Sequence, residues 1–131
     1  MTKEFIKSND APPPGGAYSQ AIKAGSIIFV SGQGPLDPKT DRRGPDIETQ
    51  TSQTILNLKA ILQAGGYLLE DVVKVTVFLK NSEDFHRMNR VYQTFFPKDP
   101  PARTTVVTNF VNADMLIEID AIAYIEQKQT N

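Results

Sequence analysis

The 131-residue sequence has no cysteine, no tryptophan and a single histidine, His86. The absence of cysteine excludes disulfides, thiolate metal sites and a cysteine nucleophile, and nothing marks an oxidising compartment. One unpartnered histidine cannot build a histidine-based metal site or a nucleophilic triad. We therefore predict no metal and interpret His86 as a solvated helix residue.

An excess of charge of one sign is also missing, since 14 Lys and Arg balance 15 Asp and Glu to a formal net charge of −1. Without a basic excess, binding to nucleic acid or to an anionic membrane surface is not expected. The longest apolar run, residues 121–125, is too short to span a bilayer, and the first residues show no signal-peptide pattern. We expect a cytoplasmic protein with a single domain over residues 1–131.

Hydrophobic periodicity predicts elements in the order β-β-β-α-β-α-β-β. A helix over residues 46–64 ends at Gly65-Gly66, and a second helix is capped at Asn81-Ser82 and stopped by Pro97. Glycines and prolines predict a loop from Gly32 to about residue 45. We expect residues 109–114 to join the last two strands as a hairpin. The expected strands are residues 3–7, 19–23, 26–31, 72–80, 102–108 and 116–126.

Both helices would serve as right-handed crossovers, which places them on the same side of the sheet. The predicted fold class is therefore α+β: a two-layer sandwich of a mixed sheet with two helices on one face. In the last strand one parity suits the helix layer, and it consists of Ile117, Ile119, Ala121, Ala123 and Ile125. The other parity includes Ile122 and Tyr124, and Phe78 adds to it, so we expect neighbouring subunits to bury this second face.

Two charged residues could carry chemistry. Arg103 opens a strand, where its guanidinium could bind a carboxylate through two N–H groups, although an ordinary ion pair is the simpler interpretation. Glu118 lies on the second sheet face, either in an interface salt bridge or as a proton carrier whose ionisation burial perturbs. Tyr18 and Ser31 flank glycine-rich turns that could bind an anion, but turn chemistry alone would also explain them.

Several separated motifs then occur in a characteristic order. They are residues 16–21 (GAYSQA), residues 29–33 (FVSGQ) with residues 35–38 (PLDP), residues 73–79, Met88-Asn89 with Tyr92 and Phe95-Phe96, Pro101-Ala102-Arg103, and residues 117–123. Together they resemble the YjgF/Rid (reactive intermediate deaminase, endoribonuclease L-PSP-like) family over nearly the whole chain. The resemblance implies a chorismate-mutase-like fold and a homotrimer with clefts between its subunits.

The resemblance also implies a reaction without a cofactor: hydrolysis of 2-enamine and 2-imine acids to 2-keto acids and ammonia. The arginine matching Arg103 would bind the substrate carboxylate, and the glutamate matching Glu118 would handle a water. We expect these two residues to meet across a subunit boundary, with Tyr18 close by. The substrate-binding residues of the cleft would be Tyr18, Ser31, Gly32, Asn89 and Thr105.

Four departures from the family pattern bear on the substrate. Thr105 stands where many deaminases have cysteine, and Gly34 stands where an apolar residue commonly follows Ser-Gly-Gln. Ala17 replaces a proline, and residues 110–112 replace a common Leu-Pro. Thr105 and the altered loop could change the shape of the pocket.

Three functions are weighed. A deaminase of 2-aminoacrylate, 2-iminopropanoate and 2-iminobutanoate is favoured, because an imine carbon is electrophilic once its nitrogen is protonated, so the site needs only to position it and move protons. The alternative is a non-catalytic trimer that binds carboxylates such as 2-keto acids. A ribonuclease or translation inhibitor is least favoured, because the charge is slightly acidic and His86 has no partner.

Overall fold

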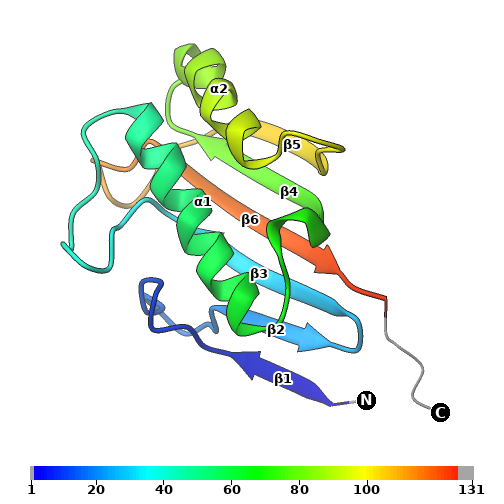
Figure 1. The fold of residues 1–131 in the computed structure, drawn as a ribbon. Coiled ribbons are helices and arrows are strands. Elements are labelled where there is room, and N and C mark those ends of the chain that lie inside the picture. Colours follow the sequence, from blue (N-terminus) through cyan, green and yellow to red (C-terminus); the bar gives the residue numbers. More distant parts are fainter. Residues whose placement is uncertain (1, 127–131) are drawn as a thin grey trace.

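The computed structural model describes residues 2–126. Six strands form one mixed sheet in the order β1-β2-β3-β6-β4-β5, and two α-helices lie on one of its faces (Figure 1). The predicted order of elements and the predicted fold class are confirmed. The strands are β1 Lys3–Ile6, β2 Ala21–Ala24, β3 Ile27–Gln33, β4 Val72–Leu79, β5 Ala102–Val107 and β6 Ile117–Tyr124; the helices are α1 Ile47–Ala64 and α2 Phe85–Phe95.

The core lies between the sheet and the helices. On β6 the residues of one parity are buried, from Ile117 to Ala123, and they face the buried side of α1. From α1, Ile55, Leu58 and Ile61 are almost inaccessible to water. Each such side chain contributes about 1.5–3 kcal/mol through its burial. The parity assigned to the helix layer is confirmed for the residues within β6.

The two ends of α1 follow the local chemistry of the sequence. The Asp46 side chain accepts a hydrogen bond of 2.8 Å from the Thr49 backbone N–H, which caps the helix and lowers the pKa of Asp46. Beyond the helix, Gly66 has a φ of +87°, a left-handed conformation that glycine adopts without strain. The predicted glycine stop is confirmed.

The predicted hairpin between the last two strands is wrong. Among the described strands, β5 pairs only with β4, in parallel, and β6 lies between β3 and β4 and is antiparallel to both. The physical reason is the crossover through α2, which sets β5 beside β4 in the same direction. Residues 108–116 then pass the end of β4 to reach its other side, instead of forming a tight turn.

Two local predictions are also corrected. A 3₁₀ turn, Ser82–Asp84, precedes α2, and no side chain caps either the turn or the helix; the Asp84 carboxylate instead accepts a 2.6 Å hydrogen bond from Arg87. Gly32 and Gln33 belong to β3 and not to the loop, with an irregularity in the pairing of β3 and β6 between Val30 and Gln33. Such a bulge re-aims the side chains near it.

The sheet face opposite the helices is rich in apolar side chains. The strand registers align Phe5, Ile22, Phe29 and Ile122 in one row across four neighbouring strands. Phe29 is 47% exposed and Phe5 is 69% exposed in the isolated chain. An apolar row of this kind is typical of an interaction surface. No helix in the described part of the chain combines the length and apolar character that crossing a membrane requires.

Two buried hydroxyls in α1, those of Thr51 and Thr54, have no hydrogen-bond partner among the described residues. An unpaired buried hydroxyl costs about 1–3 kcal/mol. We predict that Thr54→Val, which keeps the shape and removes the polar atom, raises the free energy of unfolding by about 1 kcal/mol. Urea denaturation at one fixed protein concentration measures the change.

The matched control is Thr94→Val, at an exposed position of α2, where the hydroxyl can also bond water. It should change the free energy of unfolding by less than about 0.5 kcal/mol. If Thr54→Val instead lowers the free energy of unfolding by as much as the loss of a buried hydrogen bond, the Thr54 hydroxyl has a hydrogen-bond partner and the prediction is wrong.

Candidate functional site

Glu118 projects from the open face of β6 into a cavity of about 290 Å³. Its walls come from four parts of the chain: residues 12–18, the end of β3 with residues 34–36, residues 110–115, and Arg43. We call this space the Glu118 cavity. One charged group from a strand and several loop residues therefore converge at one end of the sheet.

The Glu118 carboxylate occupies space that only a glycine at position 32 leaves open. A Cβ atom on Gly32 would collide with Glu118 Oε2. Burial raises the pKa of Glu118, and the negative charge of Asp120 raises it further. A carboxyl group with a raised pKa is suited to exchange protons near neutral pH.

Two other predicted site residues lie close to this carboxylate. Tyr18 lines the Glu118 cavity and is 51% exposed, and its hydroxyl accepts a 3.0 Å hydrogen bond from the Gly15 N–H. The proton of that hydroxyl is left for a ligand. Ser31, directly before Gly32, donates its hydroxyl proton to the Ser19 carbonyl at 2.6 Å. Ser31 therefore holds the backbone beside the cavity.

Arg103 lies in a second hollow, of about 610 Å³, between α2 and residues 96–103. Its Nη1 donates a 2.8 Å hydrogen bond to Asn89 Oδ1. The guanidinium carbon also lies 4.7 Å from the centroid of the Tyr92 ring and 5.6 Å from that of Phe85. Such contacts between cation and ring hold the guanidinium plane in place. Within residues 2–126 no carboxylate forms an ion pair with Arg103.

The Tyr92 side chain is a neutral phenol where its ring contacts the Arg103 guanidinium. Burial raises the pKa of Tyr92, and the opposing effect of the Arg103 charge is smaller. Asn89 and Tyr92 are three residues apart on α2, a spacing that puts both side chains on one face of a helix. The sequence does not predict the contacts of Tyr92 and Phe85 with Arg103, because aromatic residues on a helix usually indicate an ordinary apolar face. The three-residue spacing from Asn89 was the signal available.

Arg103 and Glu118 lie on opposite faces of the sheet. Arg103 is in register with Val75, which is buried beneath the helices, whereas Glu118 is in register with Phe78 on the open face. Side chains of one parity on neighbouring strands share a face. Within one subunit the predicted residues thus form two groups: Tyr18, Ser31 and Gly32 near Glu118, and Asn89 with Arg103. Thr105 follows Arg103 on the same face of β5.

The chemistry available to these groups is acid–base and electrostatic. Across residues 2–126, no three side chains of His, Asp or Glu come together as a set of metal ligands. The Arg103 hollow offers a fixed cation to an anion, and the Glu118 cavity offers a carboxyl group that can take up or release a proton.

The chain is a small α+β protein with a chorismate-mutase-like fold. It matches known proteins along most of its length. The family model described as Endoribonuclease L-PSP matches residues 8–125, and the chain belongs to this family, which includes the YjgF, RutC and Rid proteins. The sequence is 53% identical over 126 residues to a RutC family protein of Pyrococcus horikoshii, covering 95% of this chain and 99% of the relative.

Two further comparisons bear on the site. The sequence is 40% identical over 121 residues to the 2-iminobutanoate/2-iminopropanoate deaminase of Salmonella typhimurium, covering 90% of this chain and 94% of that protein. The crystal structure of Escherichia coli TdcF with bound serine has a TM-score of 0.90 at 35% identity, covering 94% of this chain and 99% of that one. The resemblance found in the sequence motifs is confirmed.

We predict that the pKa of Glu118 lies above that of an ordinary glutamate and that Asp120→Asn lowers it. The substitution removes the neighbouring negative charge, and the asparagine oxygen can still accept the hydrogen bond from the Thr76 N–H, 3.0 Å in the wild type. A pH titration of the side-chain carboxyl carbons by ¹³C NMR measures both values.

The raised pKa of Glu118 also makes the stability of the folded chain depend on pH. The folded chain binds the Glu118 proton more tightly than the unfolded chain, so wild-type stability decreases as the pH rises from the unfolded-state pKa through the folded-state pKa. Glu118→Gln should abolish this decrease. A Glu118 signal that titrates at or below the ordinary value would contradict the assignment.

Proposed function

We propose that this protein hydrolyses 2-imino and 2-enamine acids, such as 2-iminopropanoate, 2-aminoacrylate and 2-iminobutanoate, to 2-keto acids and ammonia. The observation that carries the proposal is the state of Arg103: it is held by Asn89 and two aromatic rings, yet no carboxylate of the described residues neutralises it. A guanidinium has five N–H donors, so its contact with Asn89 leaves others for a ligand carboxylate.

We further propose that the active site forms between subunits of a homotrimer. A small substrate cannot touch Arg103 and Glu118 of one subunit, because the sheet separates them. The open face that bears Glu118 is also the face with the exposed apolar row. If this face covers the β5 edge of a neighbour, Glu118 of one subunit meets Arg103 of the next. A repeated contact of this head-to-tail kind closes into a ring.

In this assembly Arg103 positions the substrate and Glu118 transfers protons. Arg103 binds the substrate carboxylate and thereby fixes the adjacent imine carbon. With the imine nitrogen protonated, a water oxygen adds to that carbon while Glu118 takes a proton from the water. Glu118 then returns the proton to nitrogen. As the carbon–nitrogen bond breaks, the hydroxyl oxygen becomes the carbonyl oxygen of the 2-keto acid and passes its proton to Glu118, and the departing ammonia takes up this proton. One carboxylate can serve all of these transfers because it accepts and releases a proton in turn.

The relatives support this choice of substrate. The Salmonella protein bears the name of a 2-iminobutanoate/2-iminopropanoate deaminase, and TdcF binds serine, a small molecule with a carboxylate next to a nitrogen-bearing carbon. A binding protein without turnover is the second candidate, favoured by one observation: Thr105 stands where many deaminases have cysteine. The slight negative charge and the exposed His86 do not favour a ribonuclease.

We predict that the purified protein releases pyruvate and ammonia from freshly generated 2-aminoacrylate faster than the uncatalysed control. Arg103→Lys keeps the charge but loses the planar pair of donors, so KM should rise about tenfold or more. Glu118→Gln removes the proton carrier, so kcat should fall by about 100-fold or more. Initial rates over a range of substrate concentrations separate the two effects.

Arg90→Ala is the matched control, because Arg90 lies exposed on α2 next to Asn89. It should leave both constants unchanged. A wild-type rate equal to the uncatalysed rate would overturn the deaminase proposal. In that case, calorimetric binding of pyruvate that disappears in Arg103→Ala would establish the binding protein instead.

A further inference from the structure

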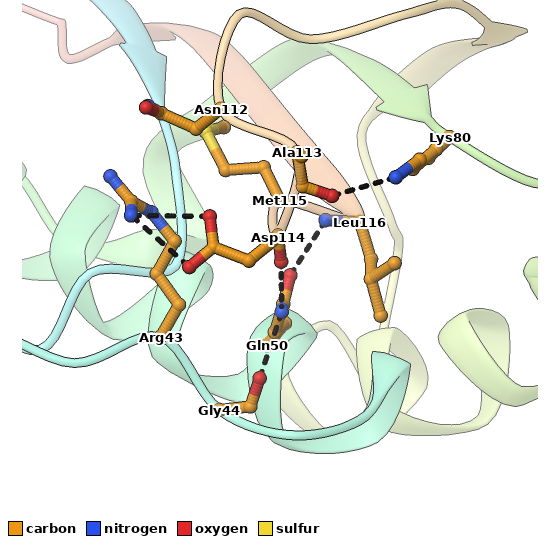
Figure 2. Close-up of polar contacts among 9 residues, drawn as sticks. All are labelled: Arg43, Gly44, Gln50, Lys80, Asn112, Ala113, Asp114, Met115 and Leu116. Atoms are coloured by element: carbon orange, nitrogen blue, oxygen red, sulfur yellow. Dashed lines mark hydrogen bonds and ion pairs between the residues drawn. The ribbon is translucent and has the colours of Figure 1, made fainter.

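Residues 109–116, which connect β5 to β6, form one wall of the Glu118 cavity. The second half of this segment is attached to α1 by the buried side chain of Gln50, which is 1% exposed. Gln50 Nε2 donates to the Asp114 carbonyl and to the Gly44 carbonyl, each at 2.8 Å. Its Oε1 accepts from the Leu116 N–H at 2.8 Å (Figure 2). One amide therefore holds the backbone on both sides of Met115.

Two cations also contact this segment. Lys80 Nζ donates to the Ala113 carbonyl at 2.6 Å, and Arg43 Nη1 lies 3.3 Å from the Asp114 carboxylate (Figure 2). The Lys80 and Arg43 contacts are exposed and contribute little, whereas a buried amide that lost its partners would leave unpaired polar groups in the core. Gln50 is thus the main constraint on this wall.

Met115 fills a space created by one of the departures from the family pattern. A Cβ atom on Gly34 would lie 2.8 Å from the Met115 methyl carbon, closer than real contacts allow. Met115 is 9% exposed, and Asn112 Nδ2 lies 3.8 Å from its sulfur. The thioether therefore takes the place that a side chain at position 34 would occupy.

The lining of the Glu118 cavity combines polar and apolar side chains. Residues 109–116 contribute the apolar side chains Phe110, Val111 and Met115 to it. If the reacting carbon lies next to Glu118, these apolar groups offer a surface for the substrate's side chain. A thioether wall is polarisable and adapts to unbranched groups.

We infer that Met115 determines which substrate side chains the Glu118 cavity admits, and that Gln50 is the positioning residue that holds Met115 there. This inference rests on the proposed function. The substrates that fit are 2-imino acids with short unbranched side chains, and branched side chains are excluded by the wall. Gln50 touches no substrate and acts through the backbone of Asp114 and Leu116.

The experiment compares kcat/KM for 2-iminopropanoate with kcat/KM for the branched 2-imino-4-methylpentanoate. Met115→Ala removes most of the thioether wall and should shift the ratio toward the branched acid by about tenfold or more. Gln50→Leu frees the wall and should shift it in the same direction, mainly through KM. Met115→Leu restores bulk at the wall and should keep the wild-type preference.

Two further variants keep the experiment decisive if one of the substituted chains fails to fold. Gly34→Ala pushes the Met115 methyl group from its place and should alter the ratio even if Gln50→Leu fails to fold. Thr54→Val, buried on α1 away from the cavity lining, should leave the ratio at the wild-type value.

The outcomes separate this inference from the function it rests on. A wild-type enzyme that hydrolyses both acids, with the same ratio in Met115→Ala and Gly34→Ala, overturns the inference and leaves the deaminase standing. If the wild type hydrolyses neither acid, the deaminase fails, and the same variants are compared by calorimetric binding of pyruvate and 4-methyl-2-oxopentanoate. An unchanged ratio of these two affinities overturns the role of Met115 in selecting ligands.

Discussion

Successive side chains of a strand point to opposite faces of its sheet, and in this protein helices cover only one face. This constraint determines which side chains are buried in the core and which are open to a ligand or a partner. It buries alternate residues of β4 and β6 beneath α1 and α2, and leaves Phe29, Ile122 and Glu118 on a face that no helix of the described residues covers. It also separates Arg103 from Glu118. Because the sheet separates the two residues within one subunit, the proposed reaction requires neighbouring subunits.

Buried amide side chains hold the loops around the Glu118 cavity through hydrogen bonds to their backbone. Gln20 donates to the carbonyls of Ser8 and Pro12, Gln50 to those of Gly44 and Asp114, and Asn57 to those of Gly34 and Leu36. All three amides are nearly inaccessible to water. Each carries two N–H donors and an acceptor, so one side chain can satisfy several buried backbone groups. The cavity wall is therefore tied to the core.

The sequence was sufficient to predict the elements, because the apolar steps of α1 and the alternation of β6 are strong local signals. It was insufficient for the place of β5, because no local pattern records that residues 108–116 cross the end of β4. Arg103 and Glu118 were recognised through the family motifs, since without them an ion pair was the simpler interpretation of each residue. The roles of Tyr92 and Gln50 depend on contacts with distant segments, and their residue types fitted an ordinary helix.

The central claim is that Arg103 of one subunit and Glu118 of the next form one active site. The direct test is to co-express Arg103→Ala and Glu118→Gln chains, each inactive alone, and to measure imine hydrolysis by the mixed assemblies. If the site is shared, random assembly of equal amounts places a subunit with intact Arg103 correctly beside one with intact Glu118 at about a quarter of the interfaces, so about a quarter of the wild-type rate should return. A mixture as inactive as either variant alone would contradict the claim.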